Sequence, residues 1–166
     1  VWLGQFHAVL LGGLEPMQVD FGDWSARVEA MGFDRHFYLN PHHLAATLVL
    51  DGAAIGELGE HSVLNTDDRS YTEFFAPACL DGSNLWENLR FLNENRVSVE
   101  RVFTGIGDEA ALLEKYVDGN VLMTEALYHK LSGDLVQGRQ RLQAALRANP
   151  EDQEFPFLMR LYFGGR

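Results

Sequence analysis

The stretch that decides the expected fold class is residues 121–150, VLMTEALYHKLSGDLVQGRQRLQAALRANP. Its apolar and small residues recur at helical spacing on both sides of Gly133-Asp134, a turn signal. They are Leu122, Ala126 and His129 before the turn, and Gly138, Leu142, Ala145 and Leu146 after it. Asn149-Pro150 closes the pattern. The sequence therefore predicts two helices, 121–131 and 135–148, that fold back on each other and cross at small residues.

Helix signals continue on both sides of this hairpin. After residue 81, start and stop residues predict helices at 85–93, 98–103, 109–117 (ended by Gly119) and 151–163. Before residue 81 the pattern is mixed. It predicts a buried strand at 6–11 and helices at 24–31 (capped by Asp23), 42–50 (after Asn40-Pro41) and 53–58. We therefore expect an α+β fold that is mainly α, with a mixed region 1–81 and a helical region 82–166.

Composition limits the classes of function. The 166 residues include 13 Lys+Arg and 24 Asp+Glu, for a net charge of −11, and 46% of them are hydrophobic. The acidic balance argues against nucleic acid as a partner, because phosphate binding needs clustered basic residues. Cys79 is the only cysteine, so no intrachain disulfide can form. No apolar run is long enough for a membrane span, and we expect a cytoplasmic chain. The start at Val1, within an apolar segment, suggests a piece of a longer chain.

The helical hairpin resembles a tetratricopeptide unit, in which small residues lie where two helices cross and a proline marks the exit. It departs from that pattern at Leu122, where an aromatic residue is usual, and at His129, where tyrosine is common. An ordinary helical hairpin is the alternative. A single repeat cannot bury its own apolar face, so the neighbouring helices must cover it. This resemblance implies a protein-interaction module that binds a protein partner through the helical tail, with no catalytic role.

The segment 64–77, LNTDDRSYTEFFAP, is the richest in groups that could do chemistry. Adjacent carboxylates at Asp67 and Asp68 could bind a cation such as a protonated amine. Arg69 could instead neutralise them within the chain. On the residues alone, a polar turn followed by an edge strand is the simpler interpretation.

The same segment closely resembles spermidine synthase-like proteins, which are often fused to membrane-spanning domains. The resemblance rests on Asn65-Thr66-Asp67-Asp68-Arg69, on Glu73-Phe74 and on Ala76-Pro77. The upstream order 8–12, 15–17 and Asp20 is similar to the last strands of their Rossmann-type, methyltransferase-like domain. The helix that begins at Pro41 and the one around Asn88 follow the same order. The resemblance covers residues 1–92 and leaves the tetratricopeptide-like tail as an appendage.

This resemblance implies that the intact parent transfers an aminopropyl group from decarboxylated S-adenosylmethionine to a diamine. It implies polyamine-side substrate-binding roles for Asn65, Asp67, Asp68, Tyr71 and Glu73. The family's glycine-rich nucleoside-binding loop and its catalytic aspartate motif do not occur in these 166 residues. We therefore expect this chain to hold no catalytic residue and no cofactor, and to be inert by itself.

Four histidines are candidate metal ligands. His42 and His43 are adjacent and point to different faces of the expected helix, which makes them a poor metal pair. A zinc site that adds His36 and His61 is conceivable, but the spacing does not require it. Solvated or core histidines are the favoured interpretation, so the sequence predicts no metal site.

Overall fold

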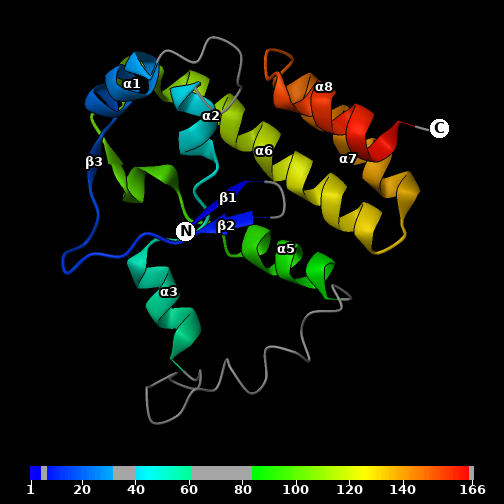
Figure 1. Ribbon diagram of the computed structural model, residues 1–166, viewed down its shortest axis with the longest axis horizontal. Helices are drawn as coiled ribbons and strands as arrows, with labels where there is room; N and C mark the ends of the chain where they lie inside the picture. Colours follow the sequence, from blue (N-terminus) through cyan, green and yellow to red (C-terminus); the bar gives the residue numbers. More distant parts are fainter. Residues whose placement is uncertain (5–6, 32–39, 61–83, 165–166) are drawn as a thin grey trace.

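The computed structural model describes residues 1–4, 7–31, 40–60 and 84–164. The described chain is mainly helical with small two-stranded sheets, so the expected α+β, mainly α class is confirmed. A long helix, α6, crosses the molecule diagonally, with α5 on one side and α7 and α8 on the other (Figure 1). The β1–β2 hairpin lies between α5 and α2 (Figure 1).

The elements follow one another in an order that is mixed at first and helical later. The first part contains β1 (Trp2–Gly4), β2 (His7–Val9), β3 (Val19–Asp20), α1 (Phe21–Ala30), α2 (Pro41–Ala46) and α3 (Gly52–Gly59). The second part contains α5 (Leu85–Glu94), the 3-10 turn η3 (Val99–Arg101), β4 (Phe103–Thr104), the 3-10 turn η4 (Gly107–Glu109), α6 (Ala110–Leu131), α7 (Leu135–Ala148), α8 (Glu154–Leu158) and the π-helical turn η5 (Met159–Phe163).

The N-terminal hairpin differs from the buried strand expected at 6–11. β1 and β2 pair antiparallel, with Trp2 opposite Val9. The other edge of β1 bonds to the segment after α2, where the Leu3 N–H donates to the Thr47 carbonyl at 2.8 Å. All three residues of β2 are exposed, and in the described part of the chain β2 pairs only with β1. The prediction of a buried strand is therefore wrong. Pairing with β1 covers only one edge of β2, and the side chains on both faces of this strand are exposed.

Two helices of the first part begin at capping residues. Asp20, not Asp23, caps α1: its Oδ1 accepts the Asp23 N–H at 2.9 Å. Asn40 caps α2 as predicted, and Pro41 is the first helical residue. However, α2 ends at Ala46 and does not continue to Leu50, because the next residues pair with β1 as extended chain.

Two further predictions after residue 81 are corrected. The helix expected at 98–103 is a single 3-10 turn, because Phe103 and Thr104 leave it to pair in parallel with β3. The helix expected at 151–163 begins at Glu154, after a turn in which the Asp152 carboxylate accepts the Glu154 N–H at 2.8 Å. By contrast, α7 has its predicted bounds. It follows a turn at Gly133, whose φ of 91° favours glycine, and a cap at Asp134.

The largest correction concerns Gly119, which does not end a helix. α6 runs without a break from Ala110 to Leu131. A Cβ at Gly119 would lie 2.8 Å from Cε2 of Phe155 and 3.2 Å from the Asn149 Cβ. Gly119 therefore permits a close approach between α6 and the C-terminal segment, and Phe155 is fully buried there.

Two cores hold these elements together. The larger joins Leu3 and Val49 of the first part to buried residues of α5, α6, α7 and α8, including Leu89, Leu127 and Phe155. The smaller joins Phe21, Ala45 and Leu48 to Val102, Phe103 and Leu113. Each core draws residues from both sides of Asp81, so the two sequence regions pack against each other.

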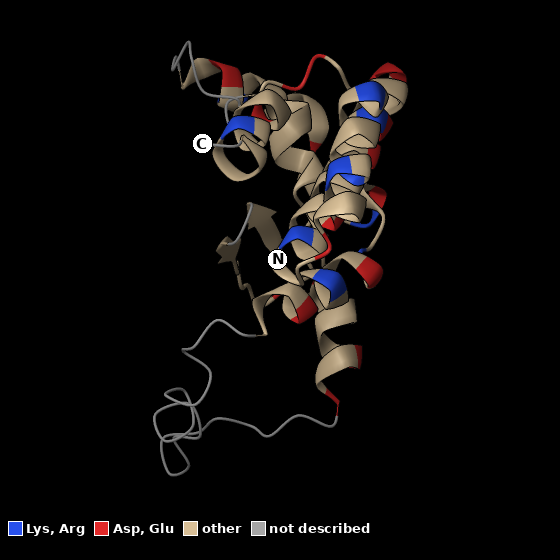
Figure 2. Cartoon of the chain, turned by 90° about the vertical axis from the view of Figure 1, so that its right-hand side faces the viewer, with Lys and Arg blue, Asp and Glu red and all other residues tan. Residues whose placement is uncertain are grey.

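Acidic and basic residues are interspersed along the described helices (Figure 2). In this view, no part of the described chain gathers basic residues alone. Among the described residues, no helix combines the length and apolarity that a membrane crossing requires.

A substitution at Gly119 tests the close approach. We expect Gly119→Ala to lower the free energy of unfolding by about 1–2 kcal/mol, because overpacking against Phe155 outweighs the gain of about 1 kcal/mol in helix propensity. The matched control is Gly56→Ala in α3, where an added Cβ meets nothing within 4 Å. Urea unfolding should show that Gly56→Ala is at least as stable as the original chain. Equal effects of the two substitutions would contradict the role assigned to Gly119.

Candidate functional site

The residues that the sequence predicts for polyamine binding lie outside the described part of the chain. They are Asn65, Asp67, Asp68, Tyr71 and Glu73, all within 61–83. His36 and His61 are also outside it. The polyamine role of this segment thus stays a prediction, and the candidate sites below come from the described residues.

The first candidate is a buried cluster around His43. Asn40 and Pro41 start α2 so that His43 lies in its first turn, where the His43 N–H donates to the Asn40 Oδ1 at 2.9 Å. The turn between α7 and α8 brings Asp152 and Glu154 to the same point. His43 Nδ1 lies 2.9 Å from Asp152 Oδ2, and His43 Nε2 lies 3.2 Å from Glu154 Oε2. The imidazole is therefore placed between two carboxylates.

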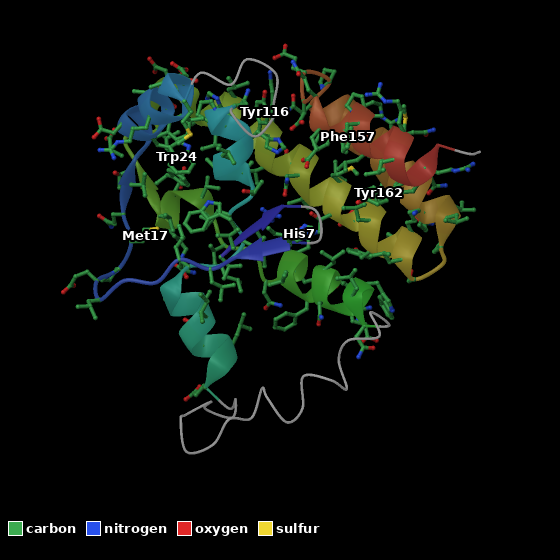
Figure 3. The ribbon with its side chains drawn as sticks, viewed as in Figure 1. His7, Met17, Trp24, Tyr116, Phe157 and Tyr162 are labelled. Carbon is green, nitrogen blue, oxygen red and sulfur yellow. The ribbon has the colours of Figure 1, made fainter. Side chains whose placement is uncertain are left out.

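The cluster is closed to solvent. The side chains of His43, Asp152 and Glu154 are each at most 4% exposed. The Tyr116 ring is nearly perpendicular to the His43 ring, with 6.4 Å between the ring centroids, and the Tyr116 hydroxyl accepts a hydrogen bond from the Asn40 Nδ2 at 2.9 Å. Tyr116 marks the place where α6 passes α2 (Figure 3). Asn40 thus holds both the backbone of His43 and the tyrosine that covers it.

Two opposing effects act on the proton of His43. Burial of the imidazole by itself lowers the pKa of His43. The hydrogen bond to Asp152 and the negative charges of Glu154 and Asp152 outweigh burial, so the pKa of His43 is raised above its ordinary value. The pKa of Tyr116 is also raised, by burial and then by the charge of Asp152. Burial and the charge of Asp152 therefore act on the pKa values of both His43 and Tyr116.

His42 has a different environment from its neighbour. Its ring stacks on Tyr116, and its Nε2 lies 2.9 Å from Oε2 of Glu109, a carboxylate that is half exposed. The expectation that the two histidines point to different faces is confirmed. The preference for a core histidine fits His43, but its two carboxylate partners were missed. They lie more than a hundred residues away in sequence, and no local pattern links them to α2.

The second candidate is an apolar edge at the N-terminal hairpin. Val9 of β2 and the residues after it are exposed: Val9 54%, Leu10 71%, Leu11 57% and Leu14 104%. Next to them, a pocket of about 360 Å³ is lined by Trp2, Leu11, Pro16 and Met17, together with Ile55 of α3. We call Val9, Leu10, Leu11 and Leu14 the apolar edge. It is a surface for packing rather than for catalysis, because its residues carry no group that could transfer a proton or bind an ion.

Comparisons of the chain with protein-family models, with curated proteins and with solved structures found no match.

Replacement of His43 tests the cluster's contribution to stability. We expect His43→Gln to lower the free energy of unfolding by about 3 kcal/mol, because it leaves two buried carboxylates without their imidazole partner. The control is His42→Gln, which removes an ion pair with a half-exposed carboxylate and should cost at most about 1 kcal/mol. Urea unfolding of both variants measures the difference. A cost for His43→Gln no larger than that for His42→Gln would show that the buried contacts contribute little.

Proposed function

We propose that this chain is the C-terminal part of a spermidine synthase-like protein. Its hairpin would complete the edge of a Rossmann-type, methyltransferase-like sheet, and its segment 65–73 would line the polyamine side of the cleft. The observation that carries this proposal is the apolar edge. The resemblance in sequence order supports it from residue 1 to residue 92.

An exposed apolar strand is a surface to which another segment can add. Among the described residues, no strand pairs with the edge of β2 that faces away from β1, and the exposed Leu10 and Leu11 follow β2 at once. Apolar strand edges of this kind tend to pair with another strand or to aggregate, so proteins normally cover them. A further strand of the same sheet would cover both the backbone and the apolar side chains.

The direction of the hairpin suits such a sheet. β1 and β2 run antiparallel, and many α/β sheets carry an antiparallel strand at one edge of an otherwise parallel set. β1 is already bonded on both sides, by β2 and by the segment after α2. The outer edge of β2 is thus where a preceding strand of the parent sheet would pair.

The chemistry proposed for the parent is aminopropyl transfer from decarboxylated S-adenosylmethionine to a diamine. Asp67 and Asp68 would attract the ammonium groups of the diamine, with Asn65, Tyr71 and Glu73 beside them. This chain by itself would be inert, because the nucleoside-binding and catalytic motifs are not among its residues. A cytoplasmic location belongs to the proposal, since a chain with one cysteine does not depend on disulfides.

The test uses the chain joined to the residues encoded before Val1. We expect that longer protein to form spermidine from putrescine and decarboxylated S-adenosylmethionine, while the 166-residue chain alone forms none. Asp67→Asn combined with Asp68→Asn should raise the KM for putrescine roughly tenfold with little change in kcat, because the pair binds the amine in the ground state and transition state alike.

The control for this experiment is Asp23→Asn, which removes one exposed carboxylate of α1. It should leave both kinetic constants unchanged. Upstream residues without a glycine-rich strand–turn–helix would contradict the family proposal. Kinetic constants unaffected by the double substitution would contradict the polyamine role of Asp67 and Asp68.

A second candidate is a tetratricopeptide-like interaction module, and a different surface favours it. Leu135 and Val136 at the start of α7 are 51% and 67% exposed, and Phe157 of α8 and Leu161 of η5 are also exposed. Phe157 and Tyr162 lie on the outer C-terminal helix in Figure 3. Leu135, Val136 and Leu161 could receive an apolar segment of another protein.

An affinity experiment with the whole chain distinguishes this candidate. A partner that binds through the tail should be lost when Val136→Lys is introduced and retained with Gln143→Lys, an exposed position farther along α7. Retention of the partner by both variants, or recovery of none, would count against the tail as a binding surface.

A further inference from the structure

The cluster around His43 brings together three donors that transition metals prefer. One imidazole nitrogen and two carboxylate oxygens, from His43, Asp152 and Glu154, all lie within 4.8 Å of one another. Nitrogen from histidine and oxygen from carboxylates are common ligands of zinc in proteins. Two ligand atoms of a tetrahedral zinc ion lie about 3.4 Å apart, given metal–ligand bonds of about 2.0–2.1 Å. The 3.2 Å between His43 Nε2 and Glu154 Oε2 is close to that separation.

Charge makes the case stronger. With a neutral imidazole, these three side chains carry two negative charges in a place from which water is almost excluded. A proton on His43 balances one of them, whereas a divalent cation balances both. Taking charge out of water is costly unless it is paired, and a divalent cation is one partner that can pair with both carboxylates at once.

The surrounding contacts orient the three donors. The Glu154 N–H donates to the second oxygen of Asp152 at 2.8 Å, which directs Oδ2 toward His43. The Asn40 cap fixes the first turn of α2, on which His43 lies. In metal sites, a ligating histidine usually donates its other ring nitrogen to a carboxylate, and that partner tunes the ligand. In His43, Asp152 is the carboxylate partner of Nδ1, which leaves Nε2 as the nitrogen that would bind the metal.

From this geometry we propose that His43, Glu154 and Asp152 form a binding site for one divalent transition-metal ion, with zinc as the best fit. Glu154 and the Nε2 of His43 are the direct ligands, and Asp152 orients the imidazole through Nδ1. The site is enclosed by Tyr116 and by the turn before α8, so its role is structural: it fastens α2 to the C-terminal segment. Zinc would lie between the Nε2 of His43 and the Oε2 of Glu154.

The test is a titration of the whole, chelator-treated chain with zinc chloride. Calorimetry should show one zinc ion bound per chain, and the Tm should rise by roughly 5–10 °C when free zinc is about 100 times Kd. Manganese chloride should bind more weakly than zinc, in line with the usual order of affinities. Absence of one-to-one zinc binding would overturn the proposal.

Two variants locate the ion. Glu154→Gln removes a ligand charge and keeps the side-chain length, so it should weaken zinc binding by more than about tenfold. His42→Gln is the matched control, because the adjacent His42 pairs with Glu109 and with none of the three proposed donors, and this variant should bind zinc as the original chain does. Unchanged zinc affinity in Glu154→Gln would overturn the assignment.

A measurement on the original chain covers the case in which Glu154→Gln does not fold. X-ray absorption at the zinc edge should show nitrogen and oxygen neighbours at about 2.0–2.1 Å, including a single imidazole. Anomalous diffraction should then place the ion between α2 and the turn before α8. Zinc found on the exposed His7 or on the partly buried His129 would contradict the site.

Discussion

The structure depends on α6 remaining one helix through Gly119. Both cores and the His43 cluster include residues of this helix. Leu113 belongs to the smaller core, and Met123 and Leu127 belong to the larger one. Between them, Tyr116 packs against His43, and Gly119 leaves room for Phe155. Glycine inside a helix costs about 1 kcal/mol relative to alanine. That cost is offset by burying Phe155, which brings the turn with Asp152 and Glu154 close enough to reach α2.

Arg96 provides a second link around α6. Its guanidinium donates to the carbonyls of Ala46 and Leu48, at 2.8 and 2.7 Å, and to the Asn120 Oδ1 at 2.9 Å. Burial lowers the pKa of Arg96 to about 10, so it stays charged at neutral pH. Arg96 thus connects α6 to the Ala46 carbonyl at the end of α2 and to Leu48, the residue that forms a bridge with Trp2. A positive charge suits this place, because the carboxyl end of a helix carries partial negative charge.

Local signals in the sequence predicted the elements whose ends depend on neighbours in the chain. Asn40-Pro41 and Gly133-Asp134 marked helix boundaries, because the Asn40 and Asp134 side chains accept nearby backbone N–H groups and Gly133 has a positive φ angle. The errors arose where distant residues decide. Gly119 is a contact with Phe155 and not a stop, Thr47 to Leu50 leave α2 to pair with β1, and Phe103 leaves its 3-10 turn to pair with Val19. The His43 cluster escaped prediction for the same reason, since its carboxylates come from a turn far along the chain.

The two candidate sites are joined by one short segment, residues 41–50. Its beginning carries His43, held by the C-terminal turn, and its end pairs with β1, whose other edge holds β2. Any displacement of α2 would therefore move the hairpin and the apolar edge with it. The cluster, Arg96 and α6 together fix this segment from three directions. If the hairpin completes a larger sheet, the helical tail has a mechanical reason to be attached. The tail packs against β1 and so supports the hairpin onto which that sheet would pack. A metal ion at His43 would make this support more rigid.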